Sequence, residues 1–287
     1  MLLKEIKSIY HKELDKNYGV EEVSSFFYLL IVHFLKLEKF VLALTPNLVV
    51  NKEEEAILFK ALSELKQDVP VQHIIGETEF MDMRFKVSPK VLIPRPETED
   101  LVRWVIADSS AEQHQPLTIL DIGTGSGCIP IALAKHLEGA QVSALDISSD
   151  ALQVAQTNAL ENNVNLNFYQ ADILDKTSTS TINSKFDIIV SNPPYVRELE
   201  KNKMHKNVLK YEPGIALFVS DKDPLVFYRA IANFAVKNLA DDGRLYLEIN
   251  QYLGKEMLRL LSEYNFKDIE LRKDIFGNDR MVKAVKK

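Results

Sequence analysis

The sequence predicts an α/β protein in which a mainly parallel sheet of seven strands follows a small helical domain. Two observations support this. From Thr118 onward, short apolar runs alternate with longer stretches of helical periodicity, a pattern typical of a parallel sheet with helices on both faces. Before residue 76, by contrast, the apolar residues recur at helical spacing.

Residues 1–75 are predicted to form a helical bundle, with helical periodicity in the stretches 6–14, 23–35 and 56–65. Asn51, followed by a lysine and three glutamates, is a typical helix N-cap. This region holds nine lysines, no arginine and eleven acidic residues, so its net charge of −2 argues against a basic arm for nucleic acid. We interpret it as a domain that recognises a protein; the alternative is a domain that only buttresses the second one.

Residues 76–95 are predicted to link the two domains as a β-hairpin. Apolar and polar residues alternate over 80–87, a second short apolar run covers 91–93, and the turn is expected at 88–90. Two prolines then impose an extended path before a helix begins. The second domain therefore spans residues 96–287.

Within the second domain, strands and helices are expected to alternate. The expected strands are 118–122, 141–146, 165–169, 186–191, 243–250, 266–272 and 280–285. The expected helices are 128–138, 149–162, 224–239 and 252–264. The last two strands are joined by a short connection, so we expect them to pair antiparallel.

The most informative motif, Asn-Pro-Pro-Tyr, follows the strand expected at 186–191. In open α/β sheets, ligands bind beyond the carboxyl ends of the strands. Two prolines remove two N–H donors, so an amide oxygen and a main-chain carbonyl form a pair of acceptors beside an aromatic face. Such a site suits a planar –NH2 group, whereas the alternative is a turn that merely ends a strand. The predicted substrate-binding residues are Asn192, Pro193, Pro194 and Tyr195.

A second motif indicates a nucleotide-type cofactor. After the strand expected at 118–122, glycines occupy alternate positions and a helix begins, so backbone N–H groups can approach a ligand. Asp146 lies 19 residues after the last of these glycines, where a carboxylate can accept both hydroxyls of a ribose. A second acid, two residues before the loop, favours the cationic S-adenosylmethionine over NAD. The predicted cofactor residues are Asp121, Gly123, Thr124, Gly125, Ser126, Gly127, Asp146 and Asn192.

Asp172 and Ile173 follow the third expected strand of the second domain. The aspartate is placed to hydrogen-bond an adenine amino group while the isoleucine packs against the ring. The alternative is a loop aspartate that caps a turn. No Cys or His spacing supports a metal site.

Six segments occur together in this chain: 93–99 (Ile-Pro-Arg-Pro-Glu-Thr-Glu), 121–127 (Asp-Ile-Gly-Thr-Gly-Ser-Gly), 146–148 (Asp-Ile-Ser), 192–195 (Asn-Pro-Pro-Tyr), 211–213 (Tyr-Glu-Pro) and 277–280 (Gly-x-x-Arg). In this order they resemble the HemK/PrmC-type methyltransferases, from about Val69 to the C-terminus. The resemblance implies a Rossmann-like, class I methyltransferase sheet and a docking role for the helical domain. It also implies methylation of the glutamine in the Gly-Gly-Gln motif of peptide-chain release factors, which supports translation termination.

The expected mechanism follows from the acceptor amide, whose nitrogen is a poor nucleophile. If the Asn192 oxygen and the Pro193 carbonyl accept its two hydrogens, they orient the nitrogen and favour the positive charge that develops on it. Tyr195 is expected to pack on the flat amide and exclude water. The predicted catalytic residues are therefore Asn192, Pro193 and Tyr195, with no dedicated general base.

Two alternatives remain: a base-amino methyltransferase that acts on a flipped adenine, and a cofactor-binding adaptor without activity. The net charge of −6 and the lack of a target-recognition domain after the core argue against nucleic acid binding. Asn192 and Tyr195 argue against an inactive adaptor. One cysteine, no membrane-spanning run and no signal-peptide pattern indicate a cytoplasmic protein. We expect a monomer.

Two features lie outside these patterns. Asn250 stands where the family usually has glycine in a Leu-Glu-x-Gly segment, and asparagine tolerates left-handed backbone better than most residues. Residues 197–210 hold five basic and two acidic residues, a local charge of +3. One hypothesis is a mobile lid that steers an acidic partner, and the alternative is a solvated loop without a role.

Overall fold

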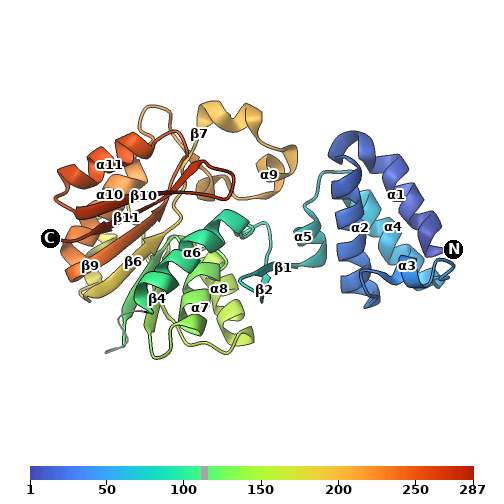
Figure 1. Cartoon of the computed structure of the whole chain (residues 1–287), viewed down its shortest axis with the longest axis horizontal. Helices are drawn as coiled ribbons and strands as arrows, with labels where there is room; N and C mark the ends of the chain where they lie inside the picture. The colour runs from blue at the N-terminus through green and yellow to red at the C-terminus, as the bar shows by residue number, and fades with distance from the viewer. Residues whose placement is uncertain (111–115) are drawn as a thin grey trace. The chain divides into compact units, whose positions relative to one another are not determined.

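The computed structural model describes residues 1–110 and 116–287, which form two compact units (Figure 1). One unit contains Met1–Glu77 together with His205–Tyr211, and the other contains Thr78–Met204 together with Glu212–Lys287. Each unit has its own hydrophobic core. Across the described ranges, no helix has the length and apolar character needed to cross a membrane.

The first unit is helical, as its periodicity predicted. A Tyr10 ring at the centre of its core meets the Phe27 ring edge-on, with centroids 5.2 Å apart. The expected N-cap is confirmed: the Asn51 side chain accepts the Glu54 N–H at 2.9 Å, and the Glu54 carboxylate accepts the Asn51 N–H at 2.7 Å. The helices are α1 (Leu3–Tyr18), α2 (Val20–Leu35), α3 (Val41–Leu44), α4 (Lys52–Leu65), α5 (Val71–Ile75) and α9 (Lys206–Tyr211).

The basic segment 197–210 is held at several points. Its last part, α9, belongs to the helical unit, where the Lys210 ammonium and the Tyr211 hydroxyl both donate to the Gln67 carbonyl. Its first part includes a 3₁₀ turn, η2 (Glu198–Lys203), in which Arg197 pairs with Glu200 at 2.8 Å. These contacts anchor the two parts of the segment differently, and the hypothesis of a lid stays a prediction.

The expected β-hairpin is present, but the expected position of its turn was wrong. β1 (Glu77–Phe80) and β2 (Met83–Lys86) form a two-stranded sheet. Met81 and Asp82 make the turn, with φ angles of 50° and 59°. Two consecutive left-handed residues suit the twist of a tight hairpin. A methionine at the first of these positions gives no sequence signal for such a turn, whereas the Ser-Pro-Lys stretch downstream does.

The second unit carries the predicted seven-stranded sheet, in the order β10-β11-β9-β6-β3-β4-β5. The pairs β9–β6, β6–β3, β3–β4 and β4–β5 are parallel, and β11 runs antiparallel to both of its neighbours, as expected for the last two strands. The strands are β3 (Thr118–Ile122), β4 (Gln141–Asp146), β5 (Asn167–Gln170), β6 (Phe186–Ser191), β9 (Leu239–Glu248), β10 (Lys267–Lys273) and β11 (Asp279–Val285). A short parallel pair, β7 (Val196–Arg197) with β8 (Phe218–Val219), follows the Asn-Pro-Pro-Tyr turn.

Helices cover both faces of the sheet, because successive strand residues point to opposite sides. Ile119 packs in a core with residues of the helices 96–109, 128–136 and 149–161, whereas Leu120 packs in a core with residues of the helices 226–238 and 254–263. All four expected helices and the helix after the hairpin are confirmed. They are α6 (Pro96–Ser109), α7 (Cys128–His136), α8 (Ser149–Glu161), α10 (Val226–Asn238) and α11 (Gly254–Glu263).

Candidate active site

The carboxyl ends of three adjacent parallel strands meet at one edge of the sheet. β3 lies between β6 and β4, so the loops that leave these strands emerge side by side. This convergence places the Asn-Pro-Pro-Tyr turn beside the glycine loop.

A cavity of about 550 Å³ opens at this edge. Eight of the expected site residues line it: Gly123, Gly125, Asp146, Asp172, Ile173, Asn192, Pro193 and Pro194. The other expected residues do not line it: Asp121, Thr124, Ser126, Gly127 and Tyr195. The sequence analysis assigned no role to several apolar lining residues, although each lies in or within a few positions of a quoted segment, a predicted site residue or an expected helix: Val91, Leu92, Ile147, Leu174, Ile215 and Phe227.

The glycine loop brings backbone close to its neighbours. Gly123 and Gly125 adopt φ angles of 77° and 53°, which favour glycine. The N–H groups of Gly123 and Thr124 both donate to the Leu145 carbonyl, at 2.8 and 3.0 Å. At Gly127, a Cβ atom would lie 3.0 Å from the Cβ of Ala155. This last glycine therefore lets the loop pack closely against α8.

Asp146 joins the glycine loop to the loop after β4. Its carboxylate accepts the Gly125 N–H and the Ser148 N–H, both at 2.9 Å. Burial raises the pKa of this carboxyl, while the backbone donors act in the opposite direction. Each oxygen keeps lone-pair capacity for a further donor, so the position still suits a ribose diol.

Asp121 is fully buried, and neither of its carboxylate oxygens has a hydrogen-bond partner. Burial raises the pKa of this carboxyl to about 7. The Thr124 hydroxyl is close enough to lower that pKa, although the two side chains form no hydrogen bond of normal geometry. A buried carboxylate without a partner, directly before the glycine loop, is compatible with a cationic ligand and unfavourable for a pyrophosphate.

Asp172 has the local role that the alternative interpretation expected, and it also lines the cavity. Its carboxylate accepts the Leu174 N–H at 2.8 Å, as in a turn-capping aspartate. Its remaining oxygen capacity and the adjacent Ile173 side chain make this side of the cavity suitable for a flat base with an amino group.

Asn192 is held by a residue from a distant part of the chain. Its side-chain –NH2 donates to the Thr98 hydroxyl at 3.1 Å, which directs the nitrogen toward α6. The side-chain oxygen of Asn192 then keeps its capacity to accept hydrogen bonds, and Asn192 lines the cavity together with Pro193 and Pro194.

Tyr195 lies differently from the expectation. Its ring packs against the core beneath the sheet edge, and its hydroxyl donates to the Glu248 carboxylate at 2.8 Å. The tyrosine therefore anchors the turn from its inner side instead of forming a wall of the cavity.

Two of the quoted segments meet at Glu212. Its buried carboxylate pairs with the Arg95 guanidinium at 2.5 Å and accepts the Ile93 N–H at 3.0 Å. Arg95 therefore pairs with the acid of the Tyr-Glu-Pro segment. The ion pair fixes residues next to Val91 and Leu92, which line the cavity.

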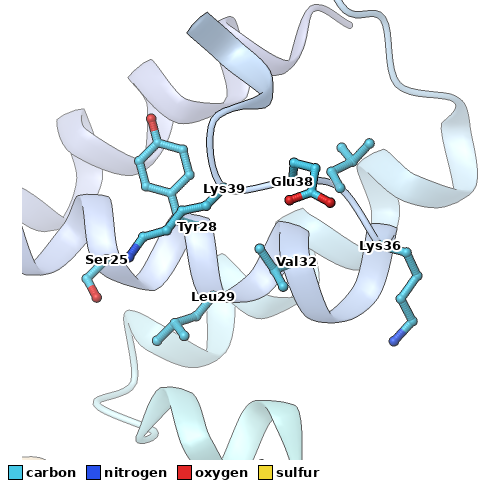
Figure 2. Close-up of a pocket in the computed structure, with 8 residues that line it drawn as sticks. Ser25, Tyr28, Leu29, Val32, Lys36, Glu38 and Lys39 are labelled. Atoms are coloured by element: carbon cyan, nitrogen blue, oxygen red, sulfur yellow. The ribbon is translucent and has the colours of Figure 1, made fainter. Parts of the chain in front are cut away.

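A second cavity, of about 460 Å³, lies in the helical unit (Figure 2). Leu29 and Val32 of α2 line it, each 44% exposed, and Lys36, Glu38 and Lys39 surround them. It contains neither a glycine loop nor an amide acceptor, so the candidate active site is the cavity at the sheet edge.

The comparisons with known proteins agree with this geometry. Residues 108–211 match the model of the methyltransferase small domain, and residues 12–76 match that of the PrmC N-terminal domain. The release factor glutamine methyltransferase of Flavobacterium psychrophilum is 49% identical over 99% of each chain. That of Bacteroides thetaiotaomicron is 39% identical over 97% of this chain and 98% of its own.

A solved 16S rRNA N2-G1207 methyltransferase from T. thermophilus, in complex with S-adenosylmethionine and guanosine, shares the fold. It is 20% identical with a TM-score of 0.53, over 74% of this chain and 50% of its own. The two relatives, aligned over nearly the whole chain, decide the family. The chain belongs to the release factor glutamine methyltransferases, enzymes that use S-adenosylmethionine as the methyl donor.

Proposed function

We propose that this enzyme transfers the methyl group of S-adenosylmethionine to the side-chain amide nitrogen, N5, of the glutamine in the Gly-Gly-Gln motif of peptide-chain release factors. One observation carries the proposal: a single cavity joins Asp146 and the glycine loop to Asn192 and Pro193. A donor site and an amide-acceptor site thus lie within reach of each other in a chain of this family.

The cavity fits S-adenosylmethionine. Asp146 would hold the ribose hydroxyls, Asp172 and Ile173 the adenine, and the backbone of Gly123 and Gly125 the chain between them. When bound, the cofactor supplies an electrophilic methyl group next to a positive sulfur.

The acceptor glutamine would lie against Asn192. The Asn192 oxygen and the Pro193 carbonyl would accept the two amide hydrogens, orient the nitrogen lone pair and favour the positive charge that develops on nitrogen. The methylated nitrogen is strongly acidic and loses its proton to water, so no side chain needs to act as a base. We assign Tyr195 to holding the turn, since its hydroxyl bonds to Glu248.

We further propose that residues 1–75 recognise the release factor, that 76–95 serve as the linker, and that 96–287 carry the chemistry. The match of residues 12–76 to the PrmC N-terminal domain supports the first assignment. A net charge of −2 in this region supports a protein partner rather than nucleic acid. We also propose that the enzyme acts as a monomer, because the residues of a single unit suffice to line both the donor part and the acceptor part of the cavity. We also propose a cytoplasmic location, which release factors as substrates would support.

The test is methyl transfer from labelled S-adenosylmethionine to four acceptors: a release factor, the same factor with the motif glutamine replaced by alanine, duplex DNA and RNA. The proposal requires label on the intact factor and none on its alanine variant. Label on adenine in DNA or RNA, with none on the factor, would instead establish the base-amino methyltransferase.

A further inference from the structure

A buried chain of hydrogen bonds runs from the Asn-Pro-Pro-Tyr turn into the core. The Asn192 –NH2 donates to the Thr98 hydroxyl at 3.1 Å, and the Thr98 hydroxyl donates to the Glu248 carboxylate at 2.7 Å. The other oxygen of the same carboxylate accepts the Tyr195 hydroxyl at 2.8 Å. One carboxylate thus connects both ends of the four-residue turn.

The two middle members of this chain of hydrogen bonds, Thr98 and Glu248, are closed to water. Thr98 is 2% exposed and Glu248 is 1% exposed. A buried carboxylate is costly unless donors satisfy it, and here two hydroxyl groups do so. Burial raises the pKa of Glu248, whereas the hydroxyls of Thr98 and Tyr195 and the charge of Arg280 lower it. Two apolar side chains of the same shape as Thr98 and Glu248 would avoid the cost of burying a carboxylate, so packing alone does not explain why these residues are polar.

The direction of these hydrogen bonds determines how the Asn192 carboxamide is oriented. A threonine hydroxyl has one hydrogen, and Thr98 donates it to Glu248. Thr98 therefore meets Asn192 only as an acceptor, so the Asn192 carboxamide must turn its –NH2 toward Thr98 and its oxygen toward the cavity. Without the Glu248 acceptor, Thr98 is free to donate to Asn192, and the flipped amide would present –NH2 to the substrate amide.

We propose that Thr98 and Glu248 are positioning residues for the methyl acceptor, which fix the Asn192 carboxamide with its oxygen toward the substrate –NH2. This inference rests on the proposed role of Asn192 as an acceptor of the amide hydrogens. Thr98 lies in the first turn of α6 and Glu248 ends β9, so the sheet and a helix together set the orientation of the side chain.

The test compares two variants that differ by one group. Thr98→Val keeps the shape of the side chain and loses the hydroxyl, whereas Thr98→Ser keeps the hydroxyl. We expect Thr98→Val to lower kcat on the intact release factor about tenfold or more, with KM, the Kd of S-adenosylmethionine and Tm little changed. Thr98→Ser should restore most of kcat. The matched control is Thr118→Val, which removes a threonine–carboxylate bond of 2.7 Å to Asp187 at the opposite end of β3 and should leave kcat unchanged.

A second readout does not depend on turnover. The side-chain N–H proton of Asn192 that bonds to Thr98, assigned by its absence in Asn192→Ala, should be protected from exchange in the wild type and in Thr98→Ser but not in Thr98→Val. Glu248→Gln should lower kcat, and its effect should shrink in the Thr98→Val background because both residues act through one bond.

Equal kcat for Thr98→Val and the wild type, or equal impairment of Thr98→Val and Thr98→Ser, would overturn the inference. So would unchanged protection of the Asn192 amide in Thr98→Val. Failure of the proposed function looks different: the wild type would then leave the release factor unlabelled, and the amide protection would still decide whether Thr98 orients Asn192.

Discussion

The Asn250 side-chain –NH2 donates to the backbone carbonyl of Tyr195 at 3.0 Å and to the Glu200 carboxylate at 2.8 Å. Asn250 has no left-handed backbone angle, so neither glycine nor the tolerance of asparagine for such geometry is required there. The residue instead ties the Asn-Pro-Pro-Tyr turn to the first part of the basic segment. Its departure from the family's usual glycine thus adds a contact to this chain.

Asn250→Ala and Asn250→Gly should both destabilise the protein, by about 1–2 kcal/mol for the lost hydrogen bonds and the buried groups left without a partner. The glycine variant should be the less stable of the two, because glycine gains more backbone freedom on unfolding. Urea denaturation would measure both. The control is Asn202→Ala, at an exposed position of η2. Equal stability of Asn250→Ala and this control would show that the hydrogen bonds of Asn250 do not stabilise the protein.

Asn192→Ala should abolish detectable turnover while S-adenosylmethionine binding stays nearly intact. The lost acceptor should cost roughly 2–4 kcal/mol of transition-state stabilisation, by analogy with oxyanion-hole donors. Calorimetry and a methyl-transfer assay on the same sample would separate binding from chemistry. Near-normal turnover would exclude Asn192 as an acceptor of the amide hydrogens.

Asp146→Ala should weaken S-adenosylmethionine binding about tenfold or more, since charge-assisted hydrogen bonds to two hydroxyls are lost. Asp146 also holds the N–H groups of Gly125 and Ser148, so part of the loss would come from a less ordered loop. Isothermal titration calorimetry would measure the Kd. Asp150→Ala removes another carboxylate from the cavity lining, one that pairs with Lys90, and should leave the Kd unchanged. Equal Kd values for Asp146→Ala and the wild type would place the ribose elsewhere.

The sequence predicted the regular elements well because their signals are local. Helical and strand periodicity, together with a short connection before β11, were sufficient for the strand positions and for the antiparallel pairing of the last strand. The turn at Met81 and Asp82 was missed because the left-handed conformation of a methionine depends on its surroundings, among them the Glu99 carboxylate that accepts the Met81 N–H at 2.8 Å.

The candidate site was predictable where a motif lies directly at a strand end, as for Gly125, Asp146 and Asn192, which all line the cavity. The hydrogen bonds that hold Asn192 were not predictable, because Thr98 and Glu248 lie 150 positions apart in the sequence and come together only in the folded protein. The same holds for Tyr195: its place beside proline suggested a cavity wall, whereas the buried Glu248 acceptor draws its hydroxyl inward.

The stability of the protein without cofactor should fall as pH rises through the weakly acidic range, and Asp121 should cause much of this fall. Burial raises the pKa of its carboxyl from 3.8 to about 7. Between these values the folded protein keeps a proton that the unfolded chain releases, so the stabilisation is complete below about pH 4 and is lost as pH approaches 7. The slope is about 1.4 kcal/mol per pH unit, and the full loss is about 4 kcal/mol.

Asp121→Asn has no carboxyl to titrate, so the variant should gain stability relative to the wild type as pH rises from 5 to 8. Urea denaturation of both proteins at several pH values would measure this difference, in which the titration of unchanged groups such as Asp146 largely cancels. Parallel stability curves for the two proteins would show that Asp121 is already ionised in the folded state at pH 5. In that case the Asp121 carboxylate would have a hydrogen-bond partner in solution, whereas both of its oxygens lack one in this structure.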